Sequence, residues 1–377
     1  MNNNQSILIH TSDRLAFKNC RRAWNWSSPI RQSLRTASTP EALWFGTAVH
    51  HGLEAFYLGQ DYQKALEQHC AEHKQDLVGK EPSLEQDDRF YELFNLALGM
   101  LQGYQRWVGI KNLNNRFIVV GTEIRFRVPL DIKQHARVYY VGKADALVYD
   151  NTTKLLWVVE FKTAAQFSSI DFLSWDEQCG SYVWAFECVR NGYGAVDIDT
   201  LIRPELFWDA TRVEGVLYDD LRKKVPAQPR VLIGGNLSVN KTQDTTYEVF
   251  YAYLEENGYS PDGYKDFLDF LLTKPNNFFR RTKVRRNPAE LLNIGINIHA
   301  EATDMCNHDL PLYPNPGYRA SNCQRCAFQG PCLAMNDDIV PDMSDYIVKD
   351  SFAGDEFFET GSPEGGELHE PGIETRA

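Results

Sequence analysis

The chain has 377 residues, of which 43% are hydrophobic and 12% aromatic, enough for a large packed core. It has no run of about 20 apolar residues that could cross a membrane, and its first residues lack the basic and apolar pattern of a signal peptide, so we expect a cytoplasmic protein with no membrane partner. The net charge of −12 argues at first against nucleic acid, but residues 336–377 hold twelve Asp or Glu and only two basic residues. The rest of the chain is nearly neutral and could still present a basic groove to phosphate groups.

The hydrophobic pattern predicts its elements in a simple order along the chain. Helices are expected over 41–58, 86–108 and 174–190, and strands over 117–128, 138–149, 154–161 and 199–208. Residues 150–153 have the composition of a hairpin turn. Beyond residue 209 the pattern becomes mainly helical. This order indicates a mixed sheet with flanking helices, an α/β fold of the α+β mixed-sheet kind.

The clearest chemical signal is a carboxylate followed by a Glu-x-Lys pattern on the next strand. Asp145 lies near the end of one predicted strand, and Glu160-Phe161-Lys162 closes its hairpin partner. The two-residue period of a strand sends Glu160 and Lys162 to one face and Phe161 into the core. Carboxylate oxygens suit Mg²⁺, which can activate water for phosphodiester hydrolysis, while a lysine orients the water or neutralises charge at phosphorus. The alternative is an ordinary solvated ion pair.

Residues on two predicted helices could complete such a site. His50 could add a nitrogen ligand, with Glu54 one turn later holding its second ring nitrogen. Gln178 and Tyr182 share one helical face and could reach a nucleic-acid backbone. A structural histidine and a buried tyrosine are the simpler alternatives.

The spacing of three cysteines indicates a thiolate-bound centre. Cys323, Cys326 and Cys332 form a C-x₂-C-x₅-C pattern, which in a reducing compartment favours metal or cluster binding over disulfides. A fourth ligand must come from elsewhere in the chain. Cys20 is the preferred candidate and Cys306 the rival.

Taken together, these motifs resemble the RecB-like branch of the PD-(D/E)XK nucleases, as found in AddB-type helicase–nucleases and CRISPR-associated RecB-like exonucleases. The resemblance runs over residues 20–332. It implies a restriction-endonuclease-like core in which Mg²⁺ or Mn²⁺ is held by His50, Asp145, Glu160 and the main-chain carbonyl of Phe161, and Lys162 is catalytic. It also implies that Gln178 and Tyr182 line the DNA path.

The resemblance further implies a [4Fe–4S] cluster on Cys20, Cys323, Cys326 and Cys332, with zinc as the alternative. The expected activity is that of a single-stranded DNA exonuclease acting on 5′ ends, in phage or mobile-element replication, recombination or repair. No helicase nucleotide-binding motif is present. A catalytically inactive, metal-stapled DNA-binding or scaffold protein is the alternative.

The expected domain organisation has five parts. They are an N-terminal segment (1–40), a nuclease core (41–210), a mainly helical insertion with a basic stretch (211–312), a cysteine clasp (313–335) and an acidic, partly disordered tail (336–377).

A basic stretch in the insertion is a candidate DNA contact. Arg281 and Lys283 are expected to share one face of a strand with Arg285, while Arg280 and Arg286 share the other, and Phe278 or Phe279 could stack on bases. The alternative is a solvated strand whose basic side chains pair with the acidic body of the protein.

The acidic tail leaves three interpretations open. The aromatic pair in residues 355–359 could bind a replication or recombination protein, the tail could cover a basic surface, or it could have no role.

Overall fold

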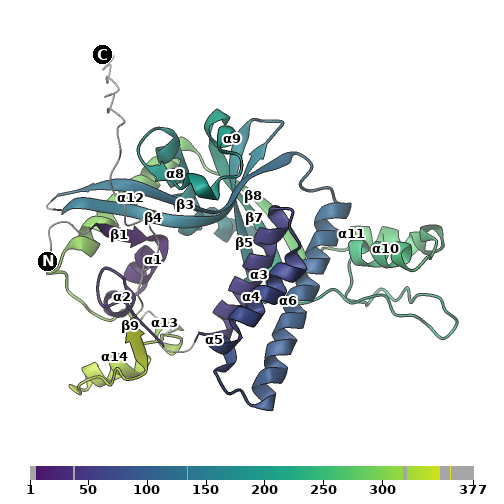
Figure 1. Ribbon diagram of the computed structural model, residues 1–377, viewed down its shortest axis with the longest axis horizontal. Coiled ribbons are helices and arrows are strands. Elements are labelled where there is room, and N and C mark those ends of the chain that lie inside the picture. The colour runs from purple at the N-terminus through teal and green to yellow at the C-terminus, as the bar shows by residue number, and fades with distance from the viewer. Residues whose placement is uncertain (1–5, 37–38, 134, 317–320, 349–356, 358–377) are drawn as a thin grey trace.

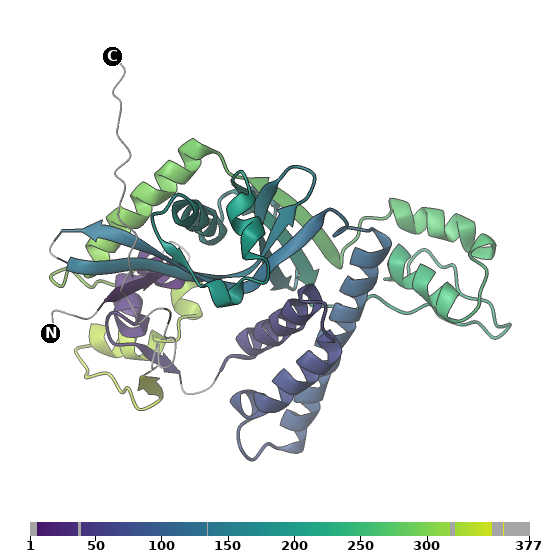
Figure 2. The ribbon, with the colours of Figure 1, turned by 45° about the horizontal axis from the view of Figure 1, so that its top comes forward.

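The computed structural model describes residues 6–36, 39–133, 135–316, 321–348 and 357. A mixed sheet forms the centre, with helices α8, α9 and α12 on one face and α3, α4 and α6 on the other (Figures 1 and 2). This arrangement confirms the expected mixed α/β class. No helix in these described ranges is long and apolar enough to cross a membrane.

The sheet has seven strands in the order β6-β3-β4-β5-β7-β8, with β1 pairing in parallel to β4. Its strands are β1 (Ile7–His10), β3 (Phe117–Ile132), β4 (His135–Asp150), β5 (Leu155–Ala164), β6 (Ala195–Val196), β7 (Val213–Arg222) and β8 (Phe279–Arg285). A separate pair joins β2 (Leu34–Thr36) to β9 (Tyr346–Val348).

Helices connect the strands and cover both faces of the sheet. They are α1 (Thr11–Asn19), α2 (Arg21–Ser27), α3 (Glu41–Tyr57), α4 (Tyr62–Glu72), α5 (Lys74–Val78), α6 (Leu84–Ile110), α7 (Ile170–Ser174), α8 (Glu177–Arg190), α9 (Pro204–Asp209), α10 (Tyr247–Glu256), α11 (Lys265–Thr273), α12 (Pro288–Cys306), α13 (Ser321–Gln324) and α14 (Gln329–Asn336), with 3₁₀ turns η1 (Ile198–Thr200) and η2 (Pro261–Tyr264).

Local chemistry explains the hairpin and helix ends that position the site. The β4–β5 turn forms where expected, because Asp150 Oδ1 accepts hydrogen bonds from the Thr152 and Thr153 amides at 3.0 and 3.3 Å. Helix α6 begins at a capping box between Ser83 and Gln86. Asp176 caps α8 by accepting from the Cys179 amide at 3.2 Å. The β4–β5 hairpin and α8 are therefore fixed by short-range contacts.

The expected strand over residues 199–208 is wrong. That segment instead forms η1 and α9. It meets the sheet edge through a bridge between Gly121 and Leu201 and through the Ile202 and Arg203 amides, which donate to the Val120 carbonyl at 2.9 and 3.1 Å. Pro204 stands at the first position of α9, where its missing amide hydrogen and fixed φ favour a helix start. The apolar pattern that predicted a strand is therefore interrupted at Pro204, where a helix begins.

The expectation of a mainly helical segment over 211–312 also needs correction. Strand β7 pairs in parallel with β5 and antiparallel with β8, so two strands of the central sheet come from this segment. Of the helices in this segment, α12 packs on the sheet, and α10 and α11 form a small unit that projects from one end of the molecule (Figure 2). Its own core contains Phe250, Leu254 and Phe267.

Two large cores lie on the opposite faces of the sheet. One packs α8 and α12 against side chains such as Phe126 and Tyr218, and the other packs α3 and α6 against side chains such as Phe161 and Leu217. Strands β5 and β7 are covered on both sides. Because they run in parallel, their carboxyl ends lie at the same edge of the sheet.

The two ends of the described chain meet below this sheet. Helices α1 and α2 lie beside α13, α14 and β9 in both views (Figures 1 and 2). The β2–β9 pair joins them directly. Most of the expected disordered tail, residues 349–356 and 358–377, lies outside the described residues.

Candidate active site

Asp145, Glu160 and Lys162 meet at the carboxyl end of β5. Lys162 Nζ donates to Glu160 Oε1 at 2.6 Å, and the Phe161 amide donates to Asp145 Oδ2 at 2.8 Å. Glu160 is buried on the α8 face, while the Phe161 ring is buried against α3. The two-residue period thus places Glu160 and Lys162 together, as the sequence predicts.

His50 reaches the same point from α3. Its Nδ1 lies 3.4 Å from Asp145 Oδ1, and its ring packs edge-on against Phe161 at a centroid distance of 5.8 Å. The expected contact with Glu54 is wrong, because that carboxylate lies 3.4 Å from Nδ1 of His51. Neighbouring positions on a helix point about 100° apart, so His50 faces the sheet edge while His51 and Glu54 lie on an adjacent stripe.

The electrostatics of the site favour a bound cation. Burial, and then repulsion from Asp145, raise the pKa of Glu160. Burial opposes the charge on His50, but the Asp145, Glu160 and Glu123 carboxylates raise its pKa overall. The Asp145 and Glu160 carboxylates are close together and partly shielded from solvent. Their mutual repulsion falls when a positive charge lies between them.

Asp176 is a site residue that the sequence analysis missed. Its carboxylate lies 3.7 Å from Lys162 Nζ while also capping α8. Burial works against the charge on Lys162, yet Glu160 and, less strongly, Asp176 raise its pKa. The lysine therefore stays charged and is held between two carboxylates. The helix predicted over 174–190 included Asp176, whereas α8 begins one residue after it, and nothing in the sequence placed this carboxylate near Lys162.

Gln178 and Tyr182 lie together on α8, as expected from their spacing. Gln178 Nε2 donates to the Tyr182 hydroxyl at 3.1 Å. Burial, followed by the Glu160 charge, raises the pKa of Tyr182 well above its usual value. Gly142 on β4 makes room for this ring, since a Cβ there would lie 3.2 Å from it and 2.5 Å from Phe126. Tyr182 is thus a neutral, buried hydroxyl close to Glu160, with Gln178 between it and solvent.

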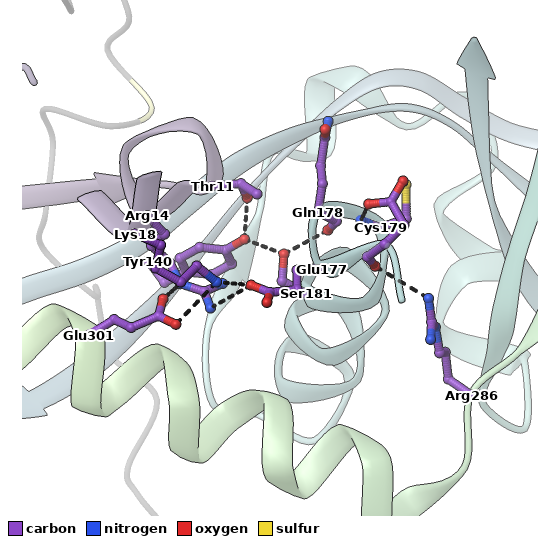
Figure 3. Close-up of polar contacts among 11 residues, drawn as sticks. Thr11, Arg14, Lys18, Tyr140, Glu177, Gln178, Cys179, Ser181, Arg286 and Glu301 are labelled. Carbon is purple, nitrogen blue, oxygen red and sulfur yellow. Dashed lines mark hydrogen bonds and ion pairs between the residues drawn. The ribbon is translucent and has the colours of Figure 1, made fainter. Parts of the chain in front are cut away.

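A polar network fixes the first turns of α8 (Figure 3). The Tyr140 hydroxyl contacts Thr11 and lies 2.5 Å from the Ser181 hydroxyl, which in turn donates to the Gln178 carbonyl at 2.6 Å. The α8 face of the site is therefore tied to β4 and to α1, and cannot shift without breaking buried hydrogen bonds.

The expectation that Arg281 contacts DNA is wrong. Its side chain is only 8% exposed, and its guanidinium donates to both oxygens of buried Asp219 at 2.6 Å. It also bonds the hydroxyls of Tyr57 and Tyr104. Arg281 thus joins β8 to β7, α3 and α6, and has no group left for a phosphate.

Most of the basic stretch follows the same pattern. Arg280 pairs with Asp220, Arg286 is buried, and Phe278 and Phe279 are each 2% exposed, which excludes them as stacking surfaces in this conformation. Lys283 remains exposed on the α6 side, above the rings of Phe117 and Trp157. The basic side chains of Arg280 and Arg281 face inward because they pair with acidic residues of β7. The sequence did not reveal these long-range pairs.

The four expected cluster cysteines approach one another. Burial raises the pKa of Cys326, and the thiols of Cys20, Cys323 and Cys332 raise it further. All eight cysteines are free. Cys306, the rival fourth ligand, is buried in the main core near Arg31 instead.

Neither group of side chains forms a finished ligand set. Among the described residues, no three or more His, Cys, Asp or Glu side chains are arranged so that they could hold a metal ion. The donor types of His50, Asp145 and Glu160 nevertheless fit Mg²⁺ or Mn²⁺, since hard oxygen ligands predominate. The four expected cysteines supply thiol donors, but among the described residues they are not arranged as a metal site.

The fold and the site define the class of protein. A mixed sheet that presents one carboxylate from β4, a Glu-x-Lys pair from β5 and a histidine from a flanking helix is the arrangement of a nuclease that cleaves phosphodiester bonds with a divalent metal. The profile of the PD-(D/E)XK nuclease superfamily matches residues 15–333, and the chain belongs to this superfamily. A comparison with curated proteins gave no significant match.

Proposed function

We propose that this protein is a metal-dependent DNA nuclease that degrades single-stranded DNA as an exonuclease, in replication, recombination or repair of a phage or mobile element. The observation that supports it most is the convergence of Asp145, Glu160 and Lys162 at one strand end, with His50 opposite. Superfamily membership supports the nuclease chemistry. Strand preference, exonuclease mode and biological setting are the finer parts of the proposal.

One group of side chains is placed to bind the metal ion. Asp145, Glu160 and His50 would hold Mg²⁺ or Mn²⁺, together with the Phe161 carbonyl. Within a strand, the amide and carbonyl of one residue point the same way, so this carbonyl faces the side on which the Phe161 amide bonds Asp145. The bound cation would supply an activated water and offset charge on the phosphate.

Lys162 then acts on the substrate directly. Glu160 and Asp176 hold its ammonium group in place and keep it protonated. A fixed positive charge at this position orients a water molecule and stabilises the negative charge that develops on the phosphoryl oxygens. Gln178, half-exposed at the rim, is placed to bond the backbone of the strand being cut.

The first test uses labelled single-stranded DNA with Mg²⁺ or Mn²⁺. We expect Asp145→Asn and Lys162→Ala each to lower the cleavage rate by a factor of about 100 or more, with an unchanged circular dichroism spectrum. Lys143→Ala is the matched control, because Lys143 lies on the same strand two residues from Asp145 but pairs outward with Glu123. Wild-type cleavage by Lys162→Ala would show that the site is wrongly assigned.

The mode of attack needs circular single-stranded DNA beside linear DNA. An exonuclease leaves the circle intact and releases short products from a linear strand, and an endonuclease cuts both. If the wild-type protein bound DNA but did not cleave it, the nuclease proposal would be rejected. The alternative of an inactive, metal-stapled DNA-binding module would then be supported.

We also propose that Cys20, Cys323, Cys326 and Cys332 bind a [4Fe–4S] cluster, with zinc as the alternative. The mutual approach of these thiols supports it. Anaerobically purified protein should be brown and contain iron, and Cys20→Ser should lose the colour and melt at a lower temperature, because the cluster closes a loop of roughly 300 residues. Cys188→Ser is the control, since Cys188 lies on α8 away from these thiols. Colourless protein with stoichiometric zinc would replace iron by zinc, and metal-free protein would exclude both.

A further inference from the structure

Two aromatic side chains stand exposed beside the candidate active site. Phe172 and Trp175, at the end of α7, are 62% and 75% exposed, and their rings form an edge-to-face pair with centroids 5.9 Å apart. Large exposed aromatic rings are uncommon on a protein surface unless they serve a contact. The neighbouring Ile170 is exposed as well, at 54%, beside the polar side chains of Asp171 and Ser174 on the same short helix.

The backbone that carries this pair is firmly held. Leu173, between the two aromatics, is buried in the main core. Its carbonyl accepts hydrogen bonds from Tyr218 at 3.3 Å and from Arg286 at 3.2 Å. The buried Arg286 guanidinium also bonds the carbonyls of Ser174 and Asp176, and its side chain points to the start of α8 (Figure 3). The outward position of the rings is thus built into the fold and is not a frayed loop.

The pair is directly joined to the catalytic end of the sheet. Trp175 precedes Asp176, whose carboxylate lies 3.7 Å from Lys162 Nζ. Trp175 is therefore one residue away in the chain from a side chain that contacts Lys162.

Positive charge lies at the same edge. Because β5 and β7 run in parallel, the residues that follow Lys162 lie beside Arg222 and Lys223. Arg222 Nε donates to the Ala165 carbonyl at 3.0 Å, and the Lys223 amide donates to the Ala164 carbonyl at 2.8 Å. The edge thus carries basic residues as well as the Glu160 and Asp176 carboxylates. Aromatic side chains together with cations form the combination that binds unpaired nucleic acid, with rings under the bases and cations along the phosphates.

We propose that Phe172 and Trp175 form a stacking platform for unpaired bases of the strand that enters the active site. The proposal rests on the nuclease function and adds the surface that selects an unpaired strand, since paired bases present no free face to these rings. The phosphates next to the stacked bases pass toward Arg222 and Lys223 on one side and toward Lys162 on the other.

The test measures binding apart from cleavage. Fluorescence anisotropy of a labelled oligonucleotide is recorded with the full chain carrying Asp145→Asn, in Mn²⁺, so that DNA is bound but not cut. We expect Phe172→Ala/Trp175→Ala to weaken single-strand binding by roughly ten-fold or more, and Trp175→Phe to retain most of it. Trp208→Ala is the matched control, because Trp208 is 50% exposed on α9, a different element.

An oligonucleotide series with single abasic positions separates stacking from a structural role. In the parent protein one or two positions should lose affinity when the base is removed, and in the platform variant this loss should disappear. The idea is overturned if the platform variant binds as tightly as the Trp208→Ala control, or if it weakens intact and abasic strands equally at every position.

The two proposals fail in distinguishable ways. Normal metal-dependent cleavage by a platform variant with control-level affinity overturns the platform and leaves the nuclease function intact. If the wild-type protein cleaves no DNA but its binding of single-stranded DNA depends on Trp175, the nuclease function is overturned and the platform is retained. A wild-type protein that binds no single-stranded DNA overturns both.

Discussion

At the scale of single residues, two buried carboxyl groups illustrate how surroundings set their charge. Glu160 is buried beside Lys162, which partly offsets the effect of burial and of Asp145 on its pKa. Asp13, at the start of α1, is only 4% exposed, and burial raises its pKa to about 6 although the Ser28 hydroxyl and the His10 backbone act in the opposite sense. Glu160 has Lys162 as a cationic partner, whereas no cationic partner of Asp13 is found among the described residues.

Asp13 therefore predicts a pH dependence of stability. Between the unfolded pKa of 3.8 and the folded value of about 6 the folded state binds more protons, so stability falls as pH rises through this window. From pH 5 to pH 8 this carboxyl should cost about 1 kcal/mol of unfolding free energy. Asp13→Asn should remove that slope, so urea unfolding curves of the variant and the wild type should diverge as pH rises. Curves that keep a constant separation would contradict the assignment.

At the scale of elements, β7 shows why a strand can be missed. Its sequence, Val213–Arg222, contains Glu214, Asp219 and Asp220, which resemble a surface segment, yet nine of its ten residues are buried. Asp219 and Asp220 lie opposite their partners Arg281 and Arg280 in the register. Glu214 pairs with Arg285, which lies opposite the neighbouring Gly215. The charges are thus internal pairs, and only the pairing of strands some 60 residues apart could reveal it.

The most deeply buried of these pairs gives a prediction for stability. Arg281→Ala would leave Asp219 without its cation between the Tyr57 and Tyr104 hydroxyls, at a cost of about 3–5 kcal/mol. Arg285→Ala is the matched control on the same strand, because its side chain is 78% exposed and its pair with Glu214 should contribute about 1 kcal/mol or less. Chemical unfolding measures both. Equal losses in the two variants would mean that the Arg281 network is not a structural support.

At the scale of the whole molecule, the two chain ends are joined beneath the sheet. The β2–β9 pair and the thiols of Cys20 and Cys326 bring the N-terminal and C-terminal regions together. The tail therefore begins later than the sequence suggested, since residues 346–348 belong to a strand. Beyond it, Phe357 packs against the cluster of Leu8 and Val141, and the Arg127 guanidinium bonds the Phe357 carbonyl at 3.2 Å.

This contact predicts an effect of the tail on DNA binding. Residues 349–377 carry eight acidic and two basic residues, and Phe357 lies where Arg125 and Arg127 face it. A chain ending at Val348, which keeps β9, should bind single-stranded DNA more tightly than the full chain at low salt. The gap should close as salt rises above about 0.1 M, where charges beyond about 10 Å are screened. Anisotropy titrations at several salt concentrations measure it, and equal affinity at every concentration would show that the tail does not compete with DNA.

The sequence by itself determined the features that depend on near neighbours. The β4–β5 hairpin, the shared face of Glu160 and Lys162, helix α3 and the pairing of Gln178 with Tyr182 all follow from short-range periodicity and turn chemistry, and the structure has them where the patterns predict. Helix periodicity alone did not fix which of its apolar side chains are buried, since Leu43 on α3 is 61% exposed.

Tertiary structure decided which polar groups meet and which remain free. It placed Asp176 beside Lys162, turned the basic stretch of β8 inward onto the acids of β7, and left Phe172 and Trp175 outside while Leu173 was buried. These outcomes depend on contacts between segments far apart in the chain. A residue's type and its local period fix the direction of its side chain, but the partner that it meets there is supplied by another strand or helix, and only the packed sheet brings that partner into place.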